Sequence, residues 1–480
     1  MNHGSRGGPG TRLRRFGNAI VAAATICAAL APVSGRAAGE AKNVIFFVGD
    51  GIGPVTITAA RVFKYKEEGA LTMDTLPYTA RVKTHSLDAQ TTDSAAAMAA
   101  YMTGIKTRND VLAMDSNTRA IGYAPLRDAA TGVADAVNNC PDGANGLAST
   151  TLLELASAKG KATGAVSTAR LTHATPAATY AHVCHRGAEY EIARQAVPGG
   201  AGYNVRLDNG VDVLMGGISH YWRPYVAGSR PQGRPDGRDL VAELQAKGYT
   251  FVNDLATLNA APAAPGVRLI GLFDFAEAQG HMSYELDRDP TKEPSLAQMT
   301  AKAIDVLAKN PNGYFLMVEG GRIDHALHAT NARRALVDTI AFDDAIRTAL
   351  AKIDPTDTLV VVTADHDHTM AFNGGGRRGS DILGINTNVA TGKPKLDVNN
   401  NTYTTLLFGN GPNRPNTRAT AAANAVAGTD YLQEAAIRRS SETHGGGDVM
   451  LFATGAGAQT FKGTIDNTRV FLLVKSAAGY

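Results

Sequence analysis

The stretch YFLMVEGGRIDHALH, residues 314–328, decides the fold. It opens with five hydrophobic residues, a length and composition typical of a strand buried on both faces. Glu319, Asp324 and His328 follow, and the spacing of four between Asp324 and His328 puts both side chains on one side of a helix. A buried strand that runs through glycines into a short polar helix indicates an α/β protein with polar groups beyond the strand end.

Two other stretches repeat this pattern. VIFFVGDG, residues 44–51, ends with Asp50, and TLVVVTADHDH, residues 358–368, ends with Asp365 and His366. A single aspartate after a strand is usually a turn residue. Acids after three strands of one sheet, however, repel one another unless a cation lies between them. Mixed aspartate and histidine ligands suit zinc, and sets of oxygen ligands suit magnesium, so the sequence predicts a metal site.

The rest of the chain alternates in the same way. Further hydrophobic runs typical of buried parallel strands lie at 164–168, 211–216, 267–273 and 449–454, and helical patterns lie at 149–160, 296–310 and 332–353. This alternation predicts an α/β fold with a doubly wound, mostly parallel central sheet and helices on both faces. Residues 374–443, rich in Gly, Asn, Thr and Arg, predict a loop-rich insertion within a single domain of residues 39–480.

Residues 1–38 have the pattern of a secretory signal peptide. Arginines precede a short hydrophobic run at 18–31, and small residues follow at Ala37 and Ala38. That run is shorter than the roughly 20 residues of a membrane-spanning helix, so we expect a cleaved leader, no membrane anchor, and a secreted or periplasmic protein. Arg14-Arg15 indicates twin-arginine export only weakly, and the route stays open.

Charge and cysteine content follow from this leader. Without residues 1–38, which hold five arginines and no acid, the formal net charge changes from +3 to −2. No basic stripe remains, and no nucleic-acid partner is implied. Of the three cysteines, Cys27 lies in the leader, and Cys140 and Cys184 either form a disulfide in an oxidising compartment or remain two separate thiols; we favour the disulfide.

The segment DAQTTDSAAAMAAYMTG, residues 88–104, allows two interpretations. Asp93 and Ser94 are good helix N-cap residues, and Gly104 is a good C-terminal stop, so the segment predicts a capped core helix. Alternatively, Ser94 lies where the helix N-terminus favours anions and could attack a phosphoryl group. The local sequence alone favours the first interpretation.

Six segments taken together resemble the alkaline phosphatase family. They are VGDGIG, TTDSAA, THATPAATYAHVCHR, VEGGRIDHALH, TADHDHT and THGGGDV, in the order of the family, and the resemblance runs from about Asn43 to about Gly455. It implies an exported enzyme that hydrolyses small-molecule phosphate monoesters through a phosphoserine, and a homodimer with a crown-like insertion.

The resemblance also implies a role for each matching residue. Ser94 matches the nucleophile, and Arg186 matches the phosphate-binding arginine, which Asp93 would orient. The implied cofactors are two zinc ions and one magnesium ion. Their ligands would be Asp324, His328 and His444 for one zinc, Asp50, Asp365 and His366 for the other, and Asp50, Thr175 and Glu319 for magnesium.

His173 and His325 match positions that vary in the family. Both are histidine here, which resembles the animal enzymes and leaves the occupancy of the third metal site open; His173 is a candidate metal ligand and His325 a candidate phosphate contact. His182 and His368 match motif positions without a direct metal role, and we expect both to be structural.

Other functions fit the sequence less well. A sulfatase would need C-x-P-x-R around the nucleophile, which DSAAAM lacks. Phosphodiesterases and related hydrolases of the superfamily share the metal-binding acids but, as a rule, not the pair Thr175 and Glu319. A non-catalytic periplasmic zinc-binding protein would need neither Ser94 nor Arg186.

Overall fold

The computed structural model describes residues 41–120, 126–127, 134–135, 140, 144–217, 220–228, 233–275 and 280–480. The predicted signal peptide lies outside the described residues. Ala38–Tyr480 forms one compact unit, which is described here.

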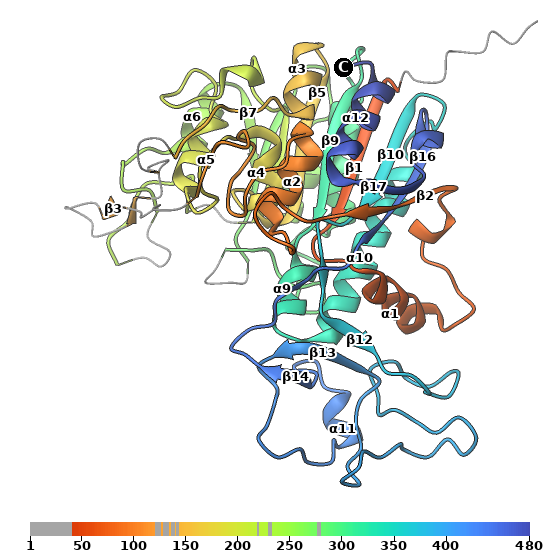
Figure 1. Cartoon of the computed structure of the whole chain (residues 1–480). Coiled ribbons are helices and arrows are strands. Elements are labelled where there is room, and N and C mark those ends of the chain that lie inside the picture. The colour runs from red at the N-terminus through yellow and green to blue at the C-terminus, as the bar shows by residue number, and fades with distance from the viewer. Residues whose placement is uncertain are drawn as a thin grey trace, which may run out of the picture. The chain divides into compact units, whose positions relative to one another are not determined.

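A ten-stranded sheet forms the centre of this unit (Figure 1). Its order is β17-β2-β16-β10-β1-β9-β5-β6-β8-β7. Seven of these strands match the predicted runs: β1 (Asn43–Gly49), β5 (Ala162–Arg170), β6 (Val213–Gly217), β8 (Arg268–Phe273), β9 (Tyr314–Gly320), β10 (Thr358–Thr363) and β16 (Val449–Gly455).

The sheet corrects one expectation about direction. The sequence predicts 449–454 as a parallel strand, but β16 pairs antiparallel with β10 on one side and with β2 (Tyr78–Lys83) on the other. The chain reaches β16 through the irregular segment after residue 374 rather than through a crossover helix, and so it can enter the sheet from the opposite end. The other pairs in the sheet are parallel, and the doubly wound, mostly parallel fold is confirmed.

Three strands of the ten-stranded sheet were not predicted from the sequence. They are β2, β7 (Tyr249–Val252) and β17 (Gly463–Asp466), and all lie at or near the two edges of the sheet. Edge strands are partly exposed and lack the continuous hydrophobic run of a central strand. This is why their sequences carry a weaker signal.

Helices cover both faces of the sheet. One layer contains α2 (Ser94–Thr103), α3 (Leu152–Ala158), α4 (Ala174–Tyr180) and α12 (Asn467–Ala478). The other contains α1 (Pro54–Tyr65), α8 (Leu296–Leu307) and α10 (Ala332–Leu350), with α9 (Arg322–His328) packed against α10. The predicted helices at 149–160, 296–310 and 332–353 correspond to α3, α8 and α10.

The region 374–443 is irregular, as predicted, but it contains a small sheet. β13 (Leu406–Gly411) pairs with β12 (Met370–Phe372) and with β14 (Ala435–Arg438), and the short helix α11 (Ala423–Val426) lies nearby. Figure 1 shows these elements away from the central sheet, beyond α9 and α1. A short pairing of β11 (Asp367–His368) with β15 (His444–Gly445) connects this region back to the end of β10.

Cys140 and Cys184 form a disulfide, with their Cα atoms 6.2 Å apart. This confirms the bridge and excludes two separate thiols. Within the described ranges, no helix is both long enough and apolar enough to cross a bilayer.

Candidate active site

Three adjacent strands bring the predicted acids together. β9, β1 and β10 are neighbours, and Val48 of β1 is in register with Glu319 on one side and with Thr363 on the other. Asp50 and Asp365 therefore follow their strands at the same edge of the sheet at which Glu319 lies, one residue before the end of β9. All three carboxylates are fully buried, so the expected convergence at the carboxyl ends of the strands occurs.

Gly51 allows β1 and β10 to meet closely at this edge. Its φ of +73° is in the left-handed region, and a Cβ at this position would lie 2.5 Å from the ring of His368. Its backbone N–H donates to Asp365 Oδ1 at 2.9 Å. A larger residue would be strained at this φ and would collide with the ring of His368.

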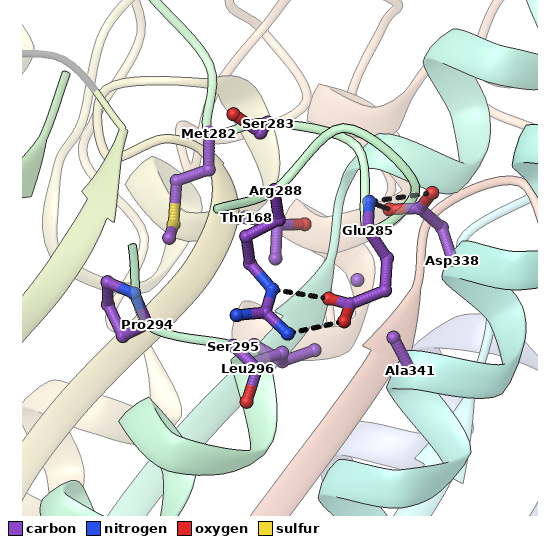
Figure 2. Close-up of a pocket in the computed structure, with 11 residues that line it drawn as sticks. Thr168, Met282, Ser283, Glu285, Arg288, Pro294, Ser295, Leu296, Asp338 and Ala341 are labelled. Carbon is purple, nitrogen blue, oxygen red and sulfur yellow. Dashed lines mark hydrogen bonds and ion pairs between the residues drawn. The ribbon is translucent and has the colours of Figure 1, made fainter. Parts of the chain in front are cut away.

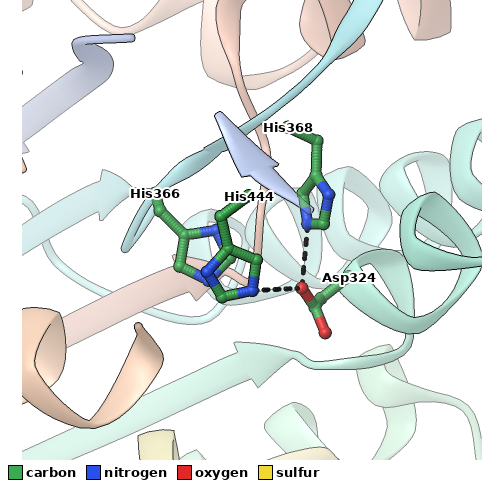
Figure 3. A group of neighbouring side chains, drawn as sticks. All are labelled: Asp324, His366, His368 and His444. Atoms are coloured by element: carbon green, nitrogen blue, oxygen red, sulfur yellow. Dashed lines mark hydrogen bonds and ion pairs between the residues drawn. The ribbon is translucent and has the colours of Figure 1, made fainter. Parts of the chain in front are cut away.

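Asp324, His328 and His444 form the first cluster. Asp324 Oδ1 lies 3.3 Å from His328 Nε2 and 3.5 Å from His444 Nε2, and the two Nε2 atoms are 3.1 Å apart. Asp324 and His328 come from α9, so the predicted helical spacing does bring both side chains to one point. His368 approaches the same oxygen of Asp324, with its Nε2 2.8 Å from Oδ1 (Figure 3).

The hydrogen bonds at Nδ1 of His328 and His444 indicate that this cluster fits a cation. His328 Nδ1 donates to the carbonyl of Glu442 at 2.7 Å, and His444 Nδ1 donates to the carbonyl of Thr92 at 2.9 Å. Each neutral ring thus carries its proton on Nδ1 and its lone pair on Nε2. Two lone pairs that face each other and a carboxylate repel one another, and a metal ion at that point would satisfy all three groups.

Asp50, Asp365 and His366 form the second cluster, which includes Ser94. His366 Nε2 lies 3.4 Å from Asp50 Oδ1, 3.2 Å from Asp365 Oδ2 and 3.2 Å from Ser94 Oγ. His366 Nδ1 faces the carbonyl of Asp367 at 3.3 Å, so Nε2 is again the unprotonated atom. The nearest nitrogen or oxygen atoms of Asp50, Asp365 and His366 lie within 4.8 Å of one another, close enough for one ion to bind all three.

A third cluster contains oxygens that have no hydrogen-bond partner within the described part of the chain. Thr175 Oγ1, Glu319 Oε1 and both carboxylate oxygens of Asp50 are buried in this way. Buried oxygens without partners are costly, and a set of them suits a hard cation such as magnesium. A ring nitrogen of His173 and carboxylate oxygens of Asp50 and Glu319 lie within 4.8 Å of one another. A cation in this third cluster could therefore also have a nitrogen ligand.

Burial and mutual repulsion shift the pKa values of these acids. Burial, reinforced by the carboxylate of Asp365, raises the pKa of Asp50 well above its usual value. Burial raises the pKa of Glu319 to about 8, although a hydrogen bond from Ser167 opposes this shift. Carboxyl groups that resist ionisation when alone are those that a bound cation would stabilise most.

In the first cluster the pKa of the carboxyl group is lowered rather than raised. Burial alone would raise the pKa of Asp324, but the neighbouring imidazole groups, among them His368, which donates to Oδ1, outweigh burial and hold this pKa well below its usual value. Burial likewise opposes the protonation of His368, yet hydrogen bonds to Asp324 and Glu442 raise its pKa to about 10. Asp324 is therefore ionised without a cation beside it.

Ser94 begins α2, and Asp93 has two functions at this position. Asp93 Oδ1 accepts from the backbone N–H of Ala96 at 2.9 Å, which caps the helix, and Gly104 ends it with φ +72°. Asp93 Oδ2 accepts from Arg186 at 3.0 Å and from the N–H of Asp110 at 3.0 Å. The capped core helix is therefore confirmed, and the same structure places Ser94 Oγ 3.2 Å from His366 Nε2, so the two interpretations are compatible.

Arg186 lies between Asp93 and His173. One guanidinium nitrogen bonds to Asp93, and the other lies 3.1 Å from His173 Nε2. The ring of His325 is 5.6 Å from that of His173, and Arg322 donates to His325 Nδ1 at 3.1 Å. Burial, with Arg322 nearby, lowers the pKa of His325 to about 3, so this side chain is neutral at neutral and alkaline pH.

Several residues in contact with these clusters were not singled out from the sequence. Ser167 donates to Glu319, His281 packs 4.0 Å from His325, and Glu442 bonds to both His368 and His328. His182, expected to be structural, bonds to buried Glu154 away from the clusters. His368, also expected to be structural, bonds to Asp324 on one side of its ring and to Glu442 on the other.

The chain matches known proteins over most of its length. The family model described as "Alkaline phosphatase" matches residues 41–480. The tissue-nonspecific alkaline phosphatase of Gallus gallus is 37% identical over 454 residues, with 88% of this chain and 82% of that protein covered. The human tissue-nonspecific isozyme is 34% identical over 462 residues, with 90% and 82% covered. Among solved structures, the alkaline phosphatase of Thermus thermophilus has a TM-score of 0.65 at 27% identity and covers 92% of each chain.

Proposed function

This chain belongs to the alkaline phosphatase family and is a metal-dependent phosphomonoesterase, and we propose that it acts through a phosphoserine formed on Ser94 beside two zinc ions and one magnesium ion. The zinc ligands would be Asp324, His328 and His444 in one site and Asp50, Asp365 and His366 in the other. Asp50, Thr175 and Glu319, with His173 nearby, would hold magnesium. The observation that carries the proposal is the 3.2 Å approach of Ser94 Oγ to His366 Nε2 within a cluster of unpaired acids.

The side chains of this chain divide the reaction between them. Arg186, held by Asp93, would take two oxygens of the phosphoryl group in a bidentate grip, and His325 would offer a neutral N–H to the same group. Ser94 Oγ would attack the phosphorus in line and expel the alcohol. Water would then cleave the phosphoserine and release phosphate. Bound zinc would lower the pKa of the serine hydroxyl and stabilise the charge on the leaving oxygen.

Loss of the Ser94 hydroxyl tests the covalent step. We expect Ser94→Ala to yield no phosphoenzyme when incubated with labelled phosphate, and to lose monoester turnover by several orders of magnitude, since the metal-binding side chains remain but the nucleophile is gone. Ser86→Ala, a buried serine outside the clusters, is the matched control and should label normally. Undiminished labelling of Ser94→Ala would refute the assignment.

A substrate panel separates this function from the alternatives. We expect the protein to cleave an aryl phosphate much faster than a bis-aryl phosphate or an aryl sulfate, and to lose that activity when a chelator removes its metals. Preference for the diester would favour a phosphodiesterase. Zinc binding without turnover of any of the three would favour a zinc-binding protein.

The location and assembly of the protein are part of the same proposal. Residues 1–38 would be removed on export to leave one catalytic domain beginning near Gly39, and the mature chains would pair as homodimers. Mass analysis of the N-terminus of secreted protein, followed by light scattering of the same sample, tests both statements. An intact residue 1, or a monomer at working concentration, would contradict the corresponding part.

A further inference from the structure

Glu442 is a buried acid that the proposed reaction does not use. Its side chain is fully enclosed in the loop between β14 and β15, two residues before His444. Oε2 accepts from His368 Nδ1 at 2.5 Å, while Oε1 accepts from the backbone N–H of Thr369 at 2.7 Å and from its hydroxyl. A buried carboxylate with three donors is well satisfied and held in one orientation.

His368 connects this carboxylate to Asp324. Its Nε2 lies 2.8 Å from Asp324 Oδ1, and its Nδ1 contacts Glu442. A carboxylate can only accept, so both ring nitrogens donate, and the ring is a positively charged bridge between two acids. The pairing of β11 with β15 fixes the position of His368 relative to His444, because the two residues are directly opposite each other in the pair.

The main chain of Glu442 holds a second predicted ligand. Its carbonyl accepts from His328 Nδ1 at 2.7 Å, and its N–H donates to the carbonyl of His328 at 2.9 Å. The first bond sets the tautomer of His328, and both together set the position of the ring. One residue therefore orients Asp324 through its side chain and His328 through its backbone.

We propose that Glu442 is a positioning residue for the zinc site of Asp324, His328 and His444, acting on Asp324 through His368; this rests on the proposed function. A carboxylate that orients a metal ligand through a hydrogen bond typically changes metal affinity by about 10- to 100-fold. The second zinc site, at Asp50, Asp365 and His366, has no recorded contact with Glu442 among the described residues.

The test measures zinc affinity rather than turnover. Full-length zinc-loaded protein is titrated with a chelator, and the metal that remains bound is counted. We expect Glu442→Gln to lose one of two zinc ions at a chelator strength about 10-fold or more below that needed for wild type, since glutamine can satisfy only one of the two groups that face the carboxylate oxygens. The other zinc ion and the magnesium should be retained as in wild type.

Glu154→Gln is the matched control. Glu154 is equally buried and accepts from His182 Nε2 at 2.7 Å, from Asn204 Nδ2 at 2.7 Å and from the N–H of Thr151 at 2.9 Å, but it has no recorded contact with the metal-binding clusters. We expect this variant to change the melting temperature of the metal-free protein and leave zinc affinity unaltered. An equal loss of zinc affinity in Glu154→Gln would mean that general destabilisation explains the result, and would overturn the proposal.

A second variant covers poor folding of the first. His368→Gln interrupts the hydrogen-bonded series from Glu442 through His368 to Asp324 at its middle member. We expect it to lower the zinc affinity of the same site. Wild-type zinc affinity in a folded Glu442→Gln or His368→Gln protein would overturn the proposal. A wild-type protein that binds no zinc would instead contradict the proposed function, so the two failures are distinguishable.

Discussion

At the scale of single residues, the site depends on where each imidazole carries its proton. His328 and His444 donate from Nδ1 to backbone carbonyls and turn Nε2 toward Asp324, while His325 accepts at Nδ1 from Arg322 and is left with a proton on Nε2. The first two rings are thus arranged to bind a cation and the third to donate to an anion. Identical residue types acquire opposite roles from the second partner of each ring.

His325 gives the first prediction at this scale. Because its pKa is lowered to about 3, it cannot add a positive charge to the phosphate site at alkaline pH, whereas a lysine there would. We expect His325→Lys to lower the inhibition constant of phosphate by about 10-fold, because a hydrogen bond from a charged donor is stronger than one from a neutral donor. If phosphate release limits turnover, kcat should fall as well. Steady-state kinetics at pH 9 with added phosphate measure both constants.

His325→Gln is the control, since glutamine keeps a neutral donor. Its phosphate inhibition should stay close to that of wild type. If a folded His325→Lys protein were inhibited equally or more weakly by phosphate, the side chain at 325 could not face the phosphate group.

Arg186 gives the second prediction at the scale of single residues. If Arg186 holds two phosphoryl oxygens as proposed, Arg186→Ala would remove this contact in both the ground state and the transition state, and we expect KM to rise and kcat to fall together. The loss should be smaller than that of Ser94→Ala, because the nucleophile and the metal-binding side chains stay in place. Kinetics with an aryl phosphate test this, and unchanged constants would mean that Arg186 serves only to bind Asp93.

At the scale of elements, the central strands were predictable and the contacts between distant loops were not. The hydrophobic runs that become β1, β9 and β10 are continuous because both faces are buried, and their terminal acids could be assigned to one edge of the sheet. Glu442 could not be assigned in this way. Its contacts with His368 and His328 depend on the pairing of β11 with β15, which spans more than 70 residues and leaves no periodic signal.

Helix α10 carries a buried acid whose ionisation should affect stability. Asp338 lies beside a cavity of about 10 Å³, enough for one water molecule, and its oxygens are 3.4 Å from the N–H of Glu285, which pairs with Arg288 (Figure 2). Burial raises the pKa of Asp338 to about 8, although Arg322 partly opposes this.

The sign of the resulting pH dependence follows from proton uptake. Between an unfolded pKa of about 4 and the folded value of about 8, the folded chain binds the extra proton, and so this group's stabilisation is complete below pH 4 and is lost as the pH rises to 8. We expect Asp338→Asn to be more stable than wild type at pH 9, and this advantage to shrink or reverse at pH 5. Thermal unfolding at both values measures it, with Asp305→Asn, a partly exposed acid of α8, as the control. Equal pH dependence in wild type and Asp338→Asn would exclude Asp338 as the titrating group.

At the scale of the whole molecule, one sheet edge collects residues from nearly the full length of the chain. Asp50 and His444 are about 400 positions apart, yet both contribute to adjoining clusters. Such a site forms only when β1, β9, β10 and the β11–β15 pair have come together. For this reason the order of the six motifs along the sequence predicted the site better than any single motif did. The direction of β16 could not be predicted, because a hydrophobic run does not record which end of the sheet it enters.

The disulfide gives a prediction at this scale. Cys184 is fully buried two residues before Arg186, and its bond to Cys140 closes a loop with a sequence separation of 44. A loop of this size restricts the unfolded chain enough to contribute about 3–4 kcal/mol in the chain-entropy model. We expect the double variant Cys140→Ala/Cys184→Ala to unfold at a clearly lower temperature than wild type. Its kcat should change less than its stability, because two other bonds still hold Arg186. Its guanidinium group donates to Asp93, and its backbone N–H donates to the carbonyl of Asp110.

Oxidised and reduced wild type provide the control for that double variant. Reduced wild type should melt close to the double variant, and oxidised wild type should melt higher, since the bond rather than the sulfur atoms is responsible. Alkylation of the denatured, non-reduced mature protein should modify neither cysteine, because Cys27 would have been removed with residues 1–38. Two alkylated thiols in that sample would refute the bridge, and equal melting of all three proteins would show that the loop it closes is already ordered in the unfolded chain.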